Sequence, residues 1–149
     1  MRRKLEEEAR QEMLDNVVFT GRQDKRLMPD FLASSDACLV HLRKTPLYET
    51  VLPSKIFEAA AMARPIILGV GGFSAELVRR AGAGLCVEPE NEGELLEAVD
   101  KLACSPSLRE ELGRSGRDYV LRHFDREKLA AEYLEVIRRV CTPAGSRPA

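Results

Sequence analysis

Residues 51–72, VLPSKIFEAAAMARPIILGVGG, place a lysine and a glutamate in the first turns of an expected helix. Proline favours the first helical position, so we expect this helix to begin at Pro53 and to cover 53–62. Lys55 then lies where the partial positive charge of the helix start disfavours a cation. Leu52, at the expected cap position, has no side-chain oxygen for the free N–H groups. A bound anion, typically phosphate, would explain both features.

Glu58 follows on the same face of this helix, three residues after Lys55 and four after Ser54. A carboxylate can accept hydrogen bonds from two hydroxyl groups at once, which fits the vicinal diol of a ribose. The helix face could therefore hold a diphosphate at its tip and a ribose beside it. An alternative without a ligand stays open, in which Thr50 caps the helix and Lys55 pairs with Glu58 in solvent for roughly a few tenths of a kcal/mol.

Gly69, Gly71 and Gly72 form a glycine loop between an expected strand and an expected helix. Such a loop lets the backbone approach a ligand closely, but any tight strand-to-helix turn uses glycine in the same way. The spacing differs from G-x-G-x-x-G, and no acidic residue follows at the required distance. A nicotinamide cofactor is therefore not expected.

These residues need a scaffold of alternating strands and helices to position them. Apolar runs predict strands at 17–19, 37–42, 65–68 and 84–87, with a polar loop at 43–52. Periodicity and caps predict helices at 3–14, 27–34, 53–62, 74–81, 91–103, 105–123 and 125–140. Because parallel sheets bind ligands at the carboxyl ends of their strands, the 43–52 loop, the glycine loop and the helix start at Pro53 are expected at one edge.

The expected fold class is α/β, with a Rossmann-like parallel sheet and helices on both faces. A doubly wound domain opens with a strand that leads into a phosphate loop, whereas this chain opens with a helix. We therefore expect the first strand to be lacking. The predicted organisation is an N-terminal helix at 1–15, a domain at 16–140 and a disordered tail at 141–149.

The composition indicates which kinds of partner the chain is not expected to bind. The 149 residues have 44% apolar and 32% charged side chains and a formal net charge of -1, without a basic stripe, so no nucleic-acid partner is expected. Neither an apolar run of about 18 residues nor a signal peptide occurs, so no transmembrane segment is expected. Four cysteines without CxxC spacing and two histidines without ligand spacing indicate reduced thiols in a cytoplasmic protein and no metal site.

Three segments together resemble a known family: NVVFTGR, DACLVHLRKTPLYETVLPSKIFEAAAMARPIILGVGGFSAELVRRAGAGLCVEPEN and LREELGRSGRDYVLRHFD. In this order they resemble the C-terminal donor-binding domain of a group 1 (family 4) retaining glycosyltransferase with the GT-B fold. The sequence of residues 42–58 most closely resembles the bacterial branch of the family, which acts on amino sugars and deoxy sugars for cell-surface polysaccharides. The resemblance covers 16–140 and implies that this segment is a nucleotide-sugar donor-binding domain.

The resemblance implies roles for the helix that begins near Pro53. Glu58 would hold the ribose hydroxyl groups, and the backbone of Pro53, Ser54 and Lys55 would face the diphosphate. Lys55 would also act in catalysis, because cations and the helix start stabilise the charge of the leaving diphosphate.

Two glycine-containing loops complete the donor site that the resemblance implies. The backbone of Thr20, Gly21 and Arg22 would read the nucleobase, and Gly71 and Gly72 would border the donor.

The first acid of the E-x7-E motif of the family has two candidate positions here. Eight residues separate Glu49 from Glu58, and the position with the family spacing is Thr50. Either Glu49 or Thr50 would face the donor sugar as a catalytic group, and the sequence leaves the choice open.

The resemblance also implies that the chain is a fragment. In the family, the strand and loop that open this domain carry an arginine and a lysine for the leaving diphosphate, and an N-terminal domain binds the acceptor. The whole enzyme would transfer a sugar from a nucleotide-diphosphate sugar to a lipid-linked or polysaccharide acceptor, without a metal or other cofactor, in the cytoplasm at the inner face of the membrane. The alternatives are a nucleotide-binding fragment without activity alone and a GT-B sugar-nucleotide epimerase.

Overall fold

The computed structural model of the chain describes residues 2–141. Contacts divide the chain into two compact units, Met1–Phe31 and Leu32–Ala149. The first unit contains α1 (Arg2–Gln11), the 3-10 turn η1 (Lys25–Leu27) and the beginning of α2 (Met28–Ala33). The helices predicted at 3–14 and 27–34 are therefore present, and both are shorter than predicted.

The strand predicted at 17–19 is wrong. This segment is irregular and exposed, and Val18 keeps 80% of its surface open to solvent. A strand is stable only when a neighbour pairs its backbone N–H and C=O groups, and no strand within residues 2–141 pairs with this one. Three consecutive apolar residues are not sufficient without such a neighbour.

The second unit is built on a three-stranded parallel sheet in the order β1-β2-β3. Its strands β1 (Cys38–His41), β2 (Ile66–Gly69) and β3 (Gly84–Cys86) match three predicted strands to within one residue at each end. The register sets Val40 opposite Leu68, and Leu68 opposite Cys86. This register brings the carboxyl ends of all three strands to the same edge.

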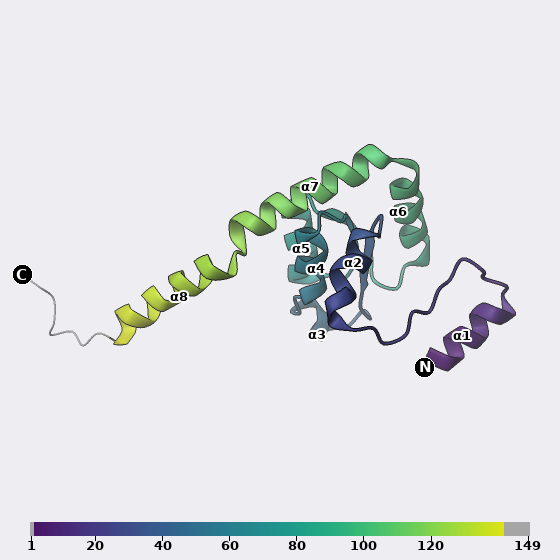
Figure 1. Cartoon of the computed structure of the whole chain (residues 1–149), viewed down its shortest axis with the longest axis horizontal. Coiled ribbons are helices and arrows are strands. Elements are labelled where there is room, and N and C mark those ends of the chain that lie inside the picture. The colour runs from purple at the N-terminus through teal and green to yellow at the C-terminus, as the bar shows by residue number, and fades with distance from the viewer. Residues whose placement is uncertain (1, 142–149) are drawn as a thin grey trace, which may run out of the picture. The chain divides into compact units, whose positions relative to one another are not determined.

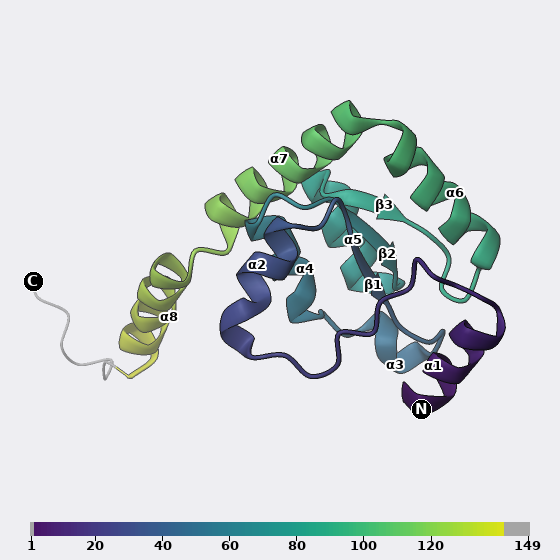
Figure 2. The same ribbon diagram turned by 45° about the vertical axis from the view of Figure 1, so that its right-hand side comes forward.

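Helices cover both faces of this sheet, as predicted. The crossover from β1 to β2 contains α3 (Pro46–Glu49) and α4 (Ser54–Ala61), and α5 (Gly72–Ala81) connects β2 to β3. After β3 come α6 (Glu92–Cys104), α7 (Pro106–His123) and α8 (Arg126–Cys141). α4, α5 and the second half of α7 lie on the face to which Ile66 and Leu68 point, whereas α6 and the first turns of α7 pack against Ile67 on the other face (Figure 1 and Figure 2). The alternation of buried residues along β2 thus forms two separate apolar layers.

Three predicted boundaries need correction. The predicted polar loop at 43–52 contains the short helix α3, which begins after its cap residue Thr45. Pro53 is the N-cap of α4 rather than its first helical residue, and α5 begins at Gly72 instead of residue 74. α8 ends at Cys141, and the remainder of the predicted tail, 142–149, lies outside the described residues.

Candidate functional site

The carboxyl ends of the strands, at His41, Gly69 and Cys86, form the edge where α/β sheets bind ligands. The segments that leave this edge are 42–53, 70–71 and 87–91. Ser74 is fully buried in α5, and its hydroxyl donates to the carbonyl oxygen of Val51 at 2.7 Å. This bond links the segment before α4 to the first turn of α5.

Helices α4 and α5 begin at this edge without a side-chain cap. Their N-cap residues are Pro53 and Gly71, and neither makes a side-chain hydrogen bond to the helix. In contrast, side-chain oxygens cap the starts of α3, α6 and α7, from Thr45, Asn91 and Ser105 respectively. The free N–H groups of α4 and α5 are therefore open to an acceptor and carry the partial positive charge of each helix.

The charged residues predicted to bind the ligand lie on the exposed face of α4. Ser54, Lys55 and Glu58 are all exposed, and no ion pair within residues 2–141 joins Lys55 to Glu58. Thr50 does not cap α4, because its hydroxyl donates to the carbonyl oxygen of Leu47 at 2.8 Å, at the end of α3. The structure therefore contradicts both parts of the explanation that needed no ligand.

A hollow of about 520 Å³ adjoins the start of α4. Its lining includes Pro53, Ser54 and Lys55 together with residues of β1 and the aromatic ring of Tyr48. The residues predicted to face a diphosphate thus border an open space.

Glu49, rather than Thr50, lies beside the glycine loop. The Cγ atom of Glu49 is 3.6 Å from the place that a Cβ atom on Gly71 would occupy. The carbonyl oxygen of Glu49 lies so close to Gly72 that a Cβ atom there would collide with it, and Gly72 has a φ of 59°. Glycine is the residue that tolerates both the contact and the left-handed backbone.

A small polar cavity of about 70 Å³ lies next to this contact. Its lining comes from the ends of β1 and β2, from α3 and from the segment after β3, namely Arg43, Lys44, Thr45, Tyr48, Glu49, Val70, Gly71, Glu88 and Pro89. The ammonium group of Lys44 pairs with the Glu88 carboxylate. This hydrogen bond and the charge of Glu88 raise the pKa of Lys44, and Glu49 and Glu90 contribute in the same direction.

The histidine at the end of β1 makes a further contact at this edge. The N–H group of Glu90 donates to Nε2 of His41 at 3.0 Å. Sequence reasoning missed this bond and the Lys44–Glu88 pair, because the partners are far apart in the chain and leave no local pattern.

The three residues predicted to read a nucleobase belong to the first unit. There the carbonyl oxygen of Thr20 accepts a hydrogen bond from the Gln23 amide, and Gly21 has a φ of 71°. Arg22 is exposed. Their role at a nucleobase remains a prediction.

Comparison with known families decides what kind of domain this is. Residues 1–105 match the family model described as glycosyl transferases group 1. The chain belongs to the group 1 glycosyl transferases. The matched segment includes both uncapped helix starts and the small polar cavity around Glu49. No curated protein matches the chain.

Solved structures show the same fold for this glycosyl transferase domain. Sucrose-phosphate synthase from Thermosynechococcus elongatus is similar with a TM-score of 0.74 and 23% identity, over 93% of this chain and 34% of that one. The C-terminal domain of a glycosyl transferase group 1 family protein from Francisella tularensis is similar with a TM-score of 0.69 and 22% identity, over 84% of this chain and 63% of that one. The chain thus spans about a third of the first protein and less than two thirds of the second.

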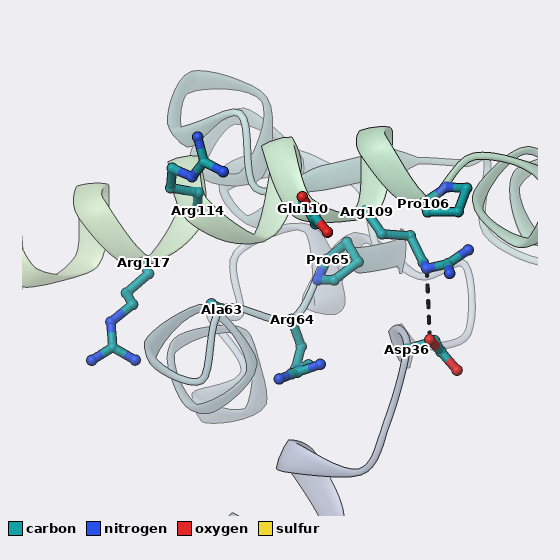
Figure 3. A pocket seen from close by; sticks show the side chains of 9 residues that line it. All are labelled: Asp36, Ala63, Arg64, Pro65, Pro106, Arg109, Glu110, Arg114 and Arg117. Carbon is teal, nitrogen blue, oxygen red and sulfur yellow. Dashed lines mark ion pairs between the residues drawn. The ribbon is translucent and has the colours of Figure 1, made fainter.

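The glycosyl transferase domain has another pocket at the opposite, amino edge of the sheet, with a volume of about 470 Å³ (Figure 3). Four arginines line it, and Figure 3 shows their guanidinium groups pointing in different directions rather than toward one point. Arg64 donates to the carbonyl oxygen of Ser35, which follows α2. Arg109 donates to the carbonyl oxygens of Leu102 and Ala103 in the last turn of α6. Arg117 donates to the carbonyl oxygen of Ala61, the last residue of α4. Arg109 also pairs with Asp36 at 3.6 Å. These arginines therefore stabilise helix ends.

Within residues 2–141 of this glycosyl transferase domain, no three His, Cys, Asp or Glu side chains are grouped closely enough to hold a metal ion. No helix in the same range is both long and apolar enough to cross a membrane.

Proposed function

We propose that this domain binds the nucleotide-diphosphate sugar from which a group 1 glycosyl transferase takes its sugar. The observation that carries the proposal is the pair of helix starts without side-chain caps, at Pro53 and Gly71, on the carboxyl edge of the sheet. Their free N–H groups and positive helix ends suit an anion with several acceptor oxygens.

The start of α4 is the proposed diphosphate site. The N–H groups of Ser54 and Lys55 donate to the phosphate oxygens, while Pro53 has no N–H group and sets the backbone direction. The ammonium group of Lys55 pairs with the same diphosphate, which explains a cation in the first turn. When the bond to the sugar breaks, charge grows on the diphosphate, and such preorganised groups stabilise it without a metal.

Different residues contact the ribose and the sugar of the donor. The Glu58 carboxylate, one turn along the exposed face of α4, accepts from the ribose hydroxyl groups. Glu49, beside Gly71 and Gly72, is the acid that faces the sugar, since the Thr50 hydroxyl already donates to α3.

The remaining parts of the proposal concern the whole enzyme. The acceptor is a lipid-linked or growing cell-surface polysaccharide, and the enzyme works in the cytoplasm at the inner membrane face. Because the chain spans only 34% of sucrose-phosphate synthase, we assign donor binding to this domain and expect transfer to need residues beyond it.

Calorimetric titration of the chain with UDP, GDP and ADP, with and without EDTA, tests the proposal. We expect one of the three to bind and EDTA to have no effect. Lys55→Ala should weaken the nucleoside diphosphate about 10- to 100-fold and the free nucleoside little, because a charged hydrogen bond is lost. Glu58→Ala should weaken both, and the exposed α6 variants Lys101→Ala and Glu97→Ala are the matched controls.

Two results would contradict these assignments. Equal losses of nucleoside and diphosphate in Lys55→Ala would remove the phosphate role, and unchanged affinity in Glu58→Ala would remove the ribose role. Failure of all three nucleotides to bind the chain would refute donor binding by this domain as it stands.

A further inference from the structure

The segment 87–91, which follows β3, forms one wall of the small polar cavity beside Glu49. Glu88 and Pro89 line this cavity together with Gly71. The N–H groups of Val87, Glu88 and Glu90 donate to residues outside this segment. The first bonds to β2 and the second to the Glu94 carboxylate of α6, whereas the third reaches across the edge to β1.

The third attachment is the Glu90 N–H group that donates to His41 Nε2 at 3.0 Å. The imidazole lies across the end of β2, since a Cβ atom added to Gly69 would collide with its Cδ2 atom. As an acceptor, Nε2 carries no proton, so the neutral ring holds its proton on Nδ1. One side chain thus connects the carboxyl ends of β1 and β2 to the segment after β3.

The backbone at Glu90 is part of a turn, which the Asn91 N–H group closes onto the Glu88 carbonyl oxygen at 3.1 Å. The φ of Glu90 is 64°, a left-handed conformation that costs energy for any residue except glycine. Such a conformation persists where the surrounding contacts fix it. Besides this turn, the bond to His41 attaches Glu90 to the end of β1.

The cavity bounded by this wall has the chemistry of a site for hydroxyl groups. Arg43 and Lys44 supply donors, and Glu49 and Glu88 supply acceptors. Its volume of about 70 Å³ is several times the 10–15 Å³ or so that one water needs, which suits a few hydroxyl or hydroxymethyl groups. It adjoins Gly71, at the end of the donor site that the proposed function assigns to the sugar.

We infer that His41 is a positioning residue, which fixes segment 87–91 through Glu90 as the wall of the subsite for the donor sugar. This inference rests on the proposed function for the identity of the ligand. The attachment of Glu90 to His41 does not depend on it.

Two variants separate the hydrogen bond from the packing of the ring. His41→Phe keeps a ring over Gly69 but has no acceptor, whereas His41→Gln has a carbonyl oxygen that can accept in place of Nε2. In NMR spectra of the wild-type chain, we expect the His41 proton on Nδ1 and a protected Glu90 amide. The amide should exchange roughly three- to tenfold faster in His41→Phe and stay protected in His41→Gln.

Binding measurements then test the sugar assignment. The nucleotide that binds best among UDP, GDP and ADP is compared with its hexose conjugate, UDP-glucose, GDP-mannose or ADP-glucose. We expect the gain in affinity from the hexose to fall roughly three- to tenfold in His41→Phe and to be retained in His41→Gln. Because His41 also lines the hollow at the start of α4, affinity for the nucleotide alone is measured in each variant, and the hexose gain is the ratio of the two affinities in the same variant.

Each contrary result overturns a different part of the inference. A wild-type Glu90 amide without protection, or a proton on Nε2 of neutral His41, overturns the attachment. An unchanged hexose gain in His41→Phe, or an equal loss in His41→Gln, overturns the sugar subsite. If no nucleotide binds, the proposed function is refuted and the sugar subsite with it, while the amide exchange still decides the attachment.

Discussion

Replacement of Gly72 by alanine is expected to destabilise the chain more than replacement of Gly82, although the two glycines have nearly the same φ. Gly72 is the first residue of α5 and Gly82 is its C-cap, with φ values of 59° and 57° respectively. What differs is the space for a side chain. A Cβ atom at Gly72 would collide with the backbone of Glu49, whereas one at Gly82 would meet the Cβ atom of Ser115 at 3.5 Å, an ordinary contact.

The expected losses of stability follow from the left-handed backbone and from the space for a side chain. A left-handed alanine costs about 1–2 kcal/mol, and the loss of glycine entropy in the unfolded chain offsets about 0.4–1 kcal/mol of it. Gly82→Ala should therefore lower the free energy of unfolding by about 1 kcal/mol. At Gly72 the same change also displaces the Glu49 backbone, which adds about 1–3 kcal/mol for an overpacked site.

Urea denaturation followed by far-UV circular dichroism measures both variants, since the sequence has no tryptophan for fluorescence. We expect the urea midpoint of Gly72→Ala to lie below that of Gly82→Ala, because of the additional cost at Gly72, while the slopes of the two transitions stay similar. Equal destabilisation of Gly72→Ala and Gly82→Ala would refute the close contact between Glu49 and the glycine loop. It would also remove the argument that Glu49, rather than Thr50, is fixed beside the sugar.

Other parts of the structure give further expected outcomes. Ser74→Ala should cost about 1–2 kcal/mol in urea denaturation, because it leaves the Val51 carbonyl oxygen without its 2.7 Å donor; no loss would show that water replaces the hydroxyl. Burial raises the pKa of the Cys38 and Cys86 thiols, so an alkylating reagent at neutral pH should label the two exposed cysteines first, and equal rates would contradict this burial. A buried thiol with a raised pKa is compatible with the folded state only while it stays protonated. The free energy of unfolding should therefore fall as pH rises above about 8.5, which urea titrations across that range would measure.

The sheet and most helices could be predicted because local residues mark them. Apolar runs identified β1, β2 and β3, and Gly82 and Asn91 marked the end of α5 and the start of α6. The helix α3 also had a signal, since Thr45 followed by Pro46 is a typical cap and first position, but four residues are shorter than a periodic pattern can reveal.

The errors concern features that depend on distant partners. Residues 17–19 have the composition of a strand, but a strand needs a neighbour, and the sequence does not show which segment supplies it. The same limit applies to the site. Pro53 itself marked the start of the helix, and Leu52 and Lys55 indicated that this start lacks a side-chain cap, whereas the bond between His41 and Glu90 joins residues 49 positions apart.

The arginines at the amino edge have a consequence for protein engineering. Arg64, Arg109 and Arg117 bind carbonyl oxygens at helix ends, whereas the starts of α4 and α5 at the carboxyl edge keep their N–H groups free. The arginine contacts that stabilise helix ends thus lie at the edge of the sheet opposite the proposed donor site. A directed-evolution library limited to the amino edge should raise the melting temperature without the trade-off against activity that stabilising changes near an active site often bring.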